Sequence, residues 1–212
     1  MLTPVLLFVI LMISLYIPPV QNLLRREVTA YASKATGMQI QVERIDLRFP
    51  LNLLVRGVEV IQQPDTLLSL ESLNVRVQAW PLVKGKVEVD EVTLSQVAFN
   101  SANLIEGMKI KGVLGRFFLQ SHGVDLSNEL AVINQTELSD THVQMLMNDT
   151  TTTPKDTTAS APVNWKVDLH KLKLKNVSFS MQLPADSMRM AAHVGEVTVN
   201  DVSADLKQQF YG

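Results

Sequence analysis

The most distinctive pattern in the sequence is a two-residue alternation of apolar and polar side chains that begins at Gln39. Such a period is typical of β-strands with one apolar face, because successive side chains point to opposite sides of a strand. The alternation runs through residues 39–49, 51–61, 67–79, 86–100 and 108–119, and resumes at 163. Gly57, Pro64 and Gly85 punctuate it as turn residues do. Residues 38–147 therefore predict a β-meander within a mainly β fold.

The alternation contains an internal repeat, in which apolar residues are separated by steps of two, three, two, three and two. The first copy has Val87, Val89, Val92, Leu94, Val97 and Phe99, and the second has Val167, Leu169, Leu172, Leu174, Val177 and Phe179. A shorter copy is Val197, Val199 and Val202, and a similar slip separates Val42 from Ile45. A step of three moves a side chain to the other face unless the strand bends or bulges there. The pattern predicts such an irregularity at each step of three.

A repeated β unit of this kind favours an extended array over a closed globule. Loose alternation is common in β-proteins and is the alternative explanation. The agreement of six positions favours a true repeat.

The first seventeen residues are apolar and uncharged, and they end at Pro18 and Pro19. As a helix they would span about 25 Å, the short end of a transmembrane segment. A cleaved signal peptide would need a basic start and a small-residue cleavage site, and neither is present. A buried core helix at an extreme terminus would be unusual. We predict that residues 1–19 anchor the chain in a membrane.

The charges beside the anchor bear on its orientation. Arg25 and Arg26 follow it, so the positive-inside rule counted literally puts the bulk of the chain in the cytoplasm. A basic leader preceding Met1 would reverse that orientation, and we expect one to be missing from this sequence.

Residues 20–37 predict an amphipathic helix. Its apolar positions, at three- and four-residue spacing, are Val20, Leu23, Leu24, Val28, Tyr31, Ala32 and Ala35. Pro19 suits the first turn of a helix, and Gly37 suits the position just past its end. Either the helix plugs the end of the sheet, which we favour, or it lies on a membrane surface.

Residues 148–162 form a threonine-rich stretch of low complexity. It has too little apolar bulk to offset its ordering entropy, so we predict a disordered loop. Asp149-Thr150 and Asp156-Thr157 resemble a short sequon of bacterial periplasmic O-glycosylation, which makes Thr150 and Thr157 candidate sites. A plain threonine-rich linker is the alternative. Residues 163–212 continue the β repeats, and we expect the chain to be truncated there.

Composition and motifs disfavour several classes of function. The chain of 212 residues has a net charge of −2, with 19% charged residues and no cysteine. We therefore expect no nucleic-acid partner, which would need a basic stripe, and no disulfide or cysteine-ligated metal. The histidines have no partner at metal-ligand spacing; they are His122, His142, His170 and His193. With no nucleophile elbow either, we expect no enzyme activity, no catalytic residue, no metal and no cofactor.

Several segments occur in an order that is more specific than any one of them. They are Leu15–Gln21, Ala35–Gly37, Val42–Leu47, Leu53–Val60, Leu67–Val75 and Trp80–Val87. From Leu15 to about Phe99 this order resembles the amino-terminal region of AsmA-like bacterial envelope proteins, and most closely of TamB-like (translocation and assembly module) proteins. The resemblance implies a single-pass inner-membrane protein whose bulk lies in the periplasm. It also implies antiparallel strands stacked into an elongated open groove with an apolar inner face.

The resemblance further implies transport of phospholipids to the outer membrane and a role in outer-membrane biogenesis. The TamB branch is also linked to assembly and secretion of outer-membrane proteins with a barrel partner. The chain departs from the family because it lacks a basic leader and the long downstream body. The candidate lipid-facing residues are Val87, Val89, Val92, Leu94, Val97, Phe99, Leu172, Leu174, Val177 and Phe179.

Three functional hypotheses follow. The chain is a lipid conduit, an assembly factor that pairs its strand edges with outer-membrane barrels, or a structural periplasmic spacer without cargo. The apolar one-faced repeats favour the first hypothesis.

Removal of residues 1–19 is expected to release the chain into the soluble fraction, because they form the one long apolar run in the sequence. Fractionation of cells that express the truncated chain measures this. Continued association with membranes would show instead that the amphipathic helix holds the protein there.

Overall fold

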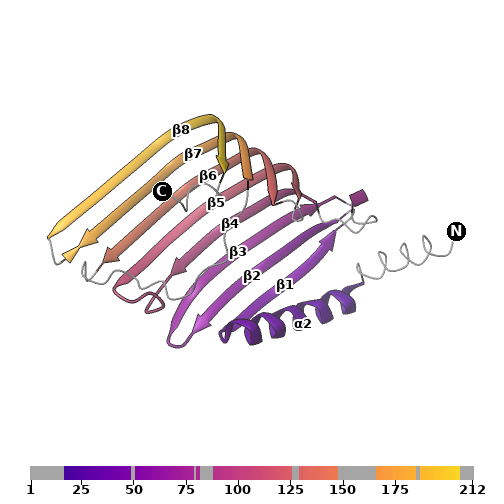
Figure 1. Cartoon of the computed structure of the whole chain (residues 1–212). Helices are drawn as coiled ribbons and strands as arrows, with labels where there is room; N and C mark the ends of the chain where they lie inside the picture. The colour runs from indigo at the N-terminus through magenta and orange to yellow at the C-terminus, as the bar shows by residue number, and fades with distance from the viewer. Residues whose placement is uncertain are drawn as a thin grey trace.

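The computed structural model describes residues 17–48, 51–78, 80–81, 88–125, 129–147, 166–184 and 187–205. Within them, one helix precedes eight strands that form a single open sheet in chain order (Figure 1). The elements are α2 (Pro18–Thr36), β1 (Gln39–Arg48), β2 (Asn52–Gln62), β3 (Asp65–Val77), β4 (Val89–Asn100), β5 (Met108–Asp125), β6 (Leu130–Met147), β7 (Lys166–Leu183) and β8 (Met188–Asp205). The prediction of a mainly β fold is confirmed.

The amino-terminal elements agree in part with the sequence patterns. Residues 1–16, most of the predicted anchor, lie outside the described residues. No helix in the described part is both long and apolar enough to cross a membrane. Helix α2 begins at Pro18 rather than at Val20, with proline in its first turn as expected. Gly37 caps its end in the left-handed conformation, and its N–H donates to the Ser33 carbonyl.

The strand directions correct one expectation. Strands β1 to β6 form the predicted antiparallel meander, and β7 pairs antiparallel with β8, but β6 and β7 run parallel. Parallel neighbours need a connection that carries the chain back along the sheet, usually of a dozen residues or more. The stretch between Met147 and Lys166 is long enough for that. It includes the predicted disordered loop of residues 148–162, which lies outside the described residues.

A row of irregular positions crosses the sheet from β1 to β8. The row, called here the central bend row, consists of Glu43, Gly57, Glu71, Gln96, Gly115, Asp140, Asn176 and Gly195. Between each two neighbouring strands, the residues of this row are not paired, whereas the residues on either side of them pair in the same register. The row therefore bends every strand without shifting its pairing, unlike a bulge, which adds a residue to one strand.

Left-handed residues produce the central bend row. Gly57, Gln96, Asp140 and Asn176 have φ between 50° and 58°. Asparagine, aspartate and glycine tolerate this conformation best. Gly57 and Gly115 are needed for space as well, because a Cβ on either would lie 2.7 Å from the Cβ of its neighbour across the ladder.

The positions of the bends confirm the sequence pattern. Gln96 and Asn176 lie within the second step of three in the two copies of the repeat, and the slip after Val42 falls at Glu43. In the first copy of the repeat, the first step of three contains Asp90, the extra residue of a register shift. In the second copy, it contains His170, which lies opposite the left-handed residue Asp201 of β8. Near this second set of irregularities, the strands β5 to β8 turn over sharply (Figure 1).

Helix α2 covers the free edge of β1 with polar side chains. Gln21 donates to the Leu47 carbonyl, Arg25 donates to the carbonyls of Val42 and Glu43, and the hydroxyl of Ser33 accepts from the Ile40 N–H. Four backbone groups of the edge strand are thereby satisfied, and the helix lies where a further strand would pair. The helix closes this end of the sheet, as expected.

The side of α2 that contacts the sheet differs from the predicted one. Gln21, Arg25 and Ser33 lie on one side of the helix, because an edge strand needs hydrogen-bonding partners more than apolar cover. Of the predicted apolar stripe, Leu23 is 56%, Val28 45% and Tyr31 77% exposed. These three side chains are thus open to an apolar environment outside the described residues.

Gly57→Ala is expected to lower the free energy of unfolding by about 2 kcal/mol, because a left-handed residue with a Cβ costs about 1–2 kcal/mol and the new Cβ would overlap Glu43. Gly195→Ala is the matched control in the same row, since its Cβ would meet nothing within 4 Å. Urea unfolding of the detergent-solubilised chain measures both. Equal losses in the two variants would contradict the role assigned to Gly57.

Candidate apolar groove

Four ladder rows of almost wholly apolar side chains cross the sheet on one face, called here the inner face. They pass through Val92, Leu94, Val97 and Phe99 of β4, two rows on each side of the central bend row. The row of Leu94 is Ile45, Val55, Leu73, Leu94, Phe117, Leu138, Leu174 and Val197. The exceptions in the other three rows are Thr136, Thr141 and Gly112. Cross-strand neighbours share a face, so the rows form one apolar surface.

The opposite face, called here the outer face, carries polar rows that are tied together by side-chain contacts. Lys173 pairs with Glu196 at 3.1 Å, and Lys175 pairs with Glu137 at 3.7 Å. The hydrogen bond to Glu196 raises the pKa of Lys173. Further contacts on this face are Asn176 with Asp140, Ser178 with His142, and Arg116 over the ring of Phe118. The ion pairs and hydrogen bonds join β7 to β6 and to β8, and the contact of Arg116 with Phe118 lies within β5.

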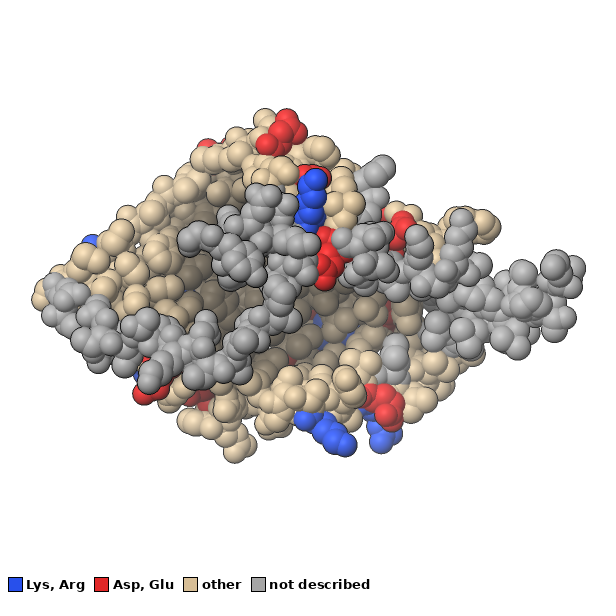
Figure 2. Space-filling view, viewed as in Figure 1, with Lys and Arg blue, Asp and Glu red and all other residues tan. Residues whose placement is uncertain are grey.

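The inner face lines a hollow. Figure 2 looks into it: the visible wall is largely uncharged, and charged side chains lie mainly around the rim. The main contacts between described elements join neighbouring strands, and α2 with β1. The four apolar rows therefore have no second layer of described secondary structure packed against them.

Burial agrees with a single layer. The buried apolar side chains among the described residues are few, and no large side chain is fully buried. Val92, Leu94, Val97 and Leu174 are half-buried, whereas Phe179 is 37% exposed. A closed domain of this size would bury such side chains inside a packed core.

The structure places the sequence-predicted groove residues together. The inner face of β4 carries Val92, Leu94, Val97 and Phe99. It is shared with β7, three ladder steps away, through Leu172, Leu174, Val177 and Phe179. Val89 lies at the start of β4, beside the register shift opposite Val77. Val87, Thr150 and Thr157 lie outside the described residues.

Sequence reasoning missed much of the inner face. The strands between and beside the two repeat copies contribute Val55, Leu73, Phe117, Leu138 and Val197 to the Leu94 row alone. Their own alternation was visible in the sequence, but it does not show which residues of different strands stand opposite each other. The ladder register supplies that.

The two edges of the sheet differ. The free edge of β1 is covered by α2, whereas no described element covers the free edge of β8. Apolar side chains of β8 are correspondingly open: Met190 is 52%, Val197 41% and Val199 39% exposed. An uncovered edge strand of this length can accept a further strand.

Two of the described histidines contact polar side chains. His142 contacts Ser178 at 2.6 Å and Gln144 at 2.8 Å, and His170 contacts Asp201 at 3.4 Å. The described residues contain no cluster of three potential metal ligands. His122 has no described side chain.

Comparison with known proteins gives no relative. No family model, no curated protein and no solved structure matches the chain.

Proposed function

We propose that the chain is a membrane-anchored, periplasmic segment of an AsmA/TamB-like protein, non-enzymatic, which binds phospholipid tails in its apolar groove for transport to the outer membrane. The observation that carries the proposal is the set of four apolar rows that no described element covers. Each methylene of an acyl chain that moves from water onto such a surface contributes about 0.8 kcal/mol.

The bent shape of the sheet supports a lipid ligand. The rows run across all eight strands, so the apolar surface is a continuous path rather than an isolated pocket. Figure 2 shows this surface as a hollow between the described strands. The predicted anchor directly precedes α2 and would hold this end of the groove beside the inner membrane.

A photo-crosslinking residue at Val197 is expected to capture phospholipid in living cells, whereas the same residue at Thr198 should not. The two positions are adjacent, both are exposed, and they lie on the inner and outer faces of β8. Mass spectrometry of the crosslinked products measures the difference. Equal lipid capture at both positions would contradict selective binding by the inner face.

Leu94→Asp tests whether the inner face is a groove or a packed core. In a core the unpaired carboxylate would cost several kcal/mol, and the protein would not accumulate. In an open groove it stays hydrated, so the chain should accumulate normally while copurified phospholipid falls severalfold. Ser95→Asp, on the outer face of the same strand, is the matched control and should leave bound lipid unchanged. Loss of the Leu94→Asp protein from cells would refute the groove.

The open edge of β8 favours a second candidate function, assembly of outer-membrane proteins by strand pairing. A strand added beside β8 would contact residues of both faces. Crosslinkers at Val197 and at Thr198 should then both capture the same outer-membrane protein, instead of lipid at one position. A purely structural spacer would give neither product.

A further inference from the structure

Helix α2 presents exposed apolar side chains that do not contact the sheet. Leu23 is 56%, Val28 45% and Tyr31 77% exposed. At 3.6 residues per turn, Tyr31 lies about 80° around the helix from Leu23, and Val28 lies about 60° further in the same direction. The three side chains, called here the exposed stripe, therefore share one half of the helix. Nothing in the groove argument uses them.

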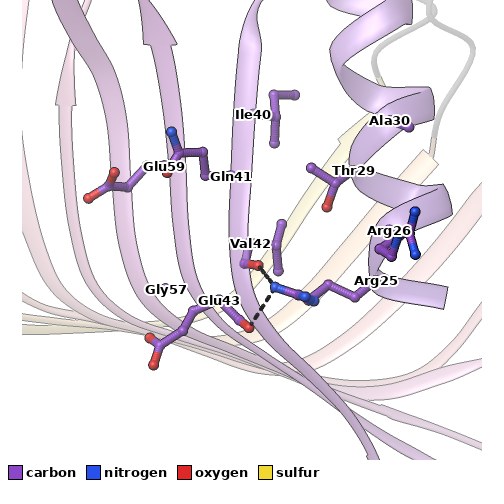
Figure 3. Close-up of a pocket in the computed structure, with 10 residues that line it drawn as sticks. All are labelled: Arg25, Arg26, Thr29, Ala30, Ile40, Gln41, Val42, Glu43, Gly57 and Glu59. Carbon is purple, nitrogen blue, oxygen red and sulfur yellow. Dashed lines mark hydrogen bonds between the residues drawn. The ribbon is translucent and has the colours of Figure 1, made fainter. Parts of the chain in front are cut away.

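Hydrogen bonds hold the other half of α2 against the sheet. The helix runs beside β1 (Figure 1), and Arg25 and Thr29 point from it toward that strand (Figure 3). Gln21, Arg25 and Ser33 make four hydrogen bonds to backbone groups of β1. The helix therefore cannot rotate to bury the exposed stripe against β1 without breaking these bonds.

The exposed stripe begins close to the predicted anchor. Leu23 comes five residues after Pro18, the first residue of α2, which is about 8 Å along a helix. An anchor in the preceding residues holds Leu23 beside the surface of the bilayer. Such a tether gives the bilayer a high effective concentration at the stripe, so a weak contact is enough. Without the anchor, a few apolar side chains give only marginal, reversible binding.

The backbone is not helical just before α2. Ile17 has φ −77° and ψ 126°, which is an extended conformation. Pro18 and Pro19 follow it, and they lack the N–H groups that a helix continuing from the anchor would use. Helix α2 is therefore a separate helix, and its direction is set by β1 rather than by the anchor.

Charged neighbours determine how deep the exposed stripe can lie. Glu27 is exposed between Leu23 and Tyr31, and it makes no ion pair with the described residues. A carboxylate is costly to bury in hydrocarbon or in a protein interface without a partner. At the level of lipid head groups it stays hydrated, and that level is also preferred by tyrosine.

We infer that the exposed stripe lies among the head groups of the membrane that holds the anchor, with α2 flat on the bilayer surface. The inference rests on the anchor of the proposed function and not on its groove. It sets β1 parallel to the membrane, because α2 runs beside that strand. The apolar rows that cross the sheet then lead away from the bilayer.

Nitroxide labels on the whole chain in phosphatidylcholine nanodiscs test the inference. The chain has no cysteine, so single labels can be attached at Leu23→Cys, Tyr31→Cys and the control Asn22→Cys. Asn22 is also exposed, but it lies about 100° from Leu23 on the side away from Tyr31. Collision with oxygen, relative to a water-soluble nickel chelate, should be severalfold higher at Leu23 and Tyr31 than at Asn22.

The control separates docking from a simple tether. On an upright or freely moving helix, Asn22 would be nearer to the bilayer than Tyr31, because it is nearer to the anchor. A ratio at Tyr31 no higher than at Asn22 would therefore overturn the inference. Dipolar coupling between Tyr31 labels, lost on dilution with unlabelled chain, would assign the stripe to a second copy and overturn the membrane contact.

A variant of the stripe gives an independent readout. With the label at Val28→Cys, replacing both Leu23 and Tyr31 by Gln should lower the oxygen-to-nickel ratio to the value at Asn22. Asn22→Gln is the matched control and should leave the ratio at Val28 unchanged. An unchanged ratio in the double variant would contradict docking through the stripe.

The outcomes separate the inference from the proposed function. Leu94→Asp, which should empty the groove, is expected to leave the ratio at Tyr31 unchanged. A fall at Tyr31 in that variant would assign the lipid there to the groove and overturn docking. If Tyr31 lies at the bilayer while a crosslinker at Val197 captures no lipid, the docking holds and the groove proposal fails.

Discussion

Keeping apolar side chains on one face of long bent strands is the constraint on which the rest of this structure depends. In a regular strand, every second residue points inward. A bend at one residue disturbs that order, so the sequence has to change phase at the same place. Here the phase changes at the central bend row in every strand, with left-handed residues such as Gln96 and Asn176. Apolar rows before and after the row therefore share the inner face.

The bends determine the shape as well as the face. A sheet of eight strands with the ordinary twist would be an open, saddle-like surface. The bends lie side by side in neighbouring strands, so the sheet folds along the line that joins them. The second set of irregularities, near Asp201, adds further curvature. The result is a hollow with one apolar wall. Ion pairs such as Lys173 with Glu196 hold the outer face, which needs no cover because it is polar.

Much of this arrangement could be predicted from the sequence. The strands, the bends at the steps of three and the cap at Gly37 all follow from local patterns. The parallel pairing of β6 with β7 could not be predicted, because it depends on the path of the connection between them rather than on either strand. The predicted contact side of α2 was wrong for a related reason. Its apolar stripe marked the obvious face, but the edge of β1 presents carbonyl and N–H groups, so Arg25 and Ser33 face it instead.

The central bend row also limits what can extend the sheet beyond β8. Val194 on one side of Gly195 faces inward, and Glu196 on the other side faces outward. An antiparallel copy of β8 aligned at Gly195 would place Glu196 opposite Val194, and residues opposite each other share a face.

A parallel copy of β8 would require the second sheet to be turned over, which sets its outer face beside the inner one. Neither arrangement continues the apolar surface. A strand that extends the inner face has to place an inward-facing residue opposite Val194 and an outward-facing residue opposite Glu196. A second β8 aligned at Gly195 does not meet this condition, so the bend that builds the groove disfavours self-pairing at this edge.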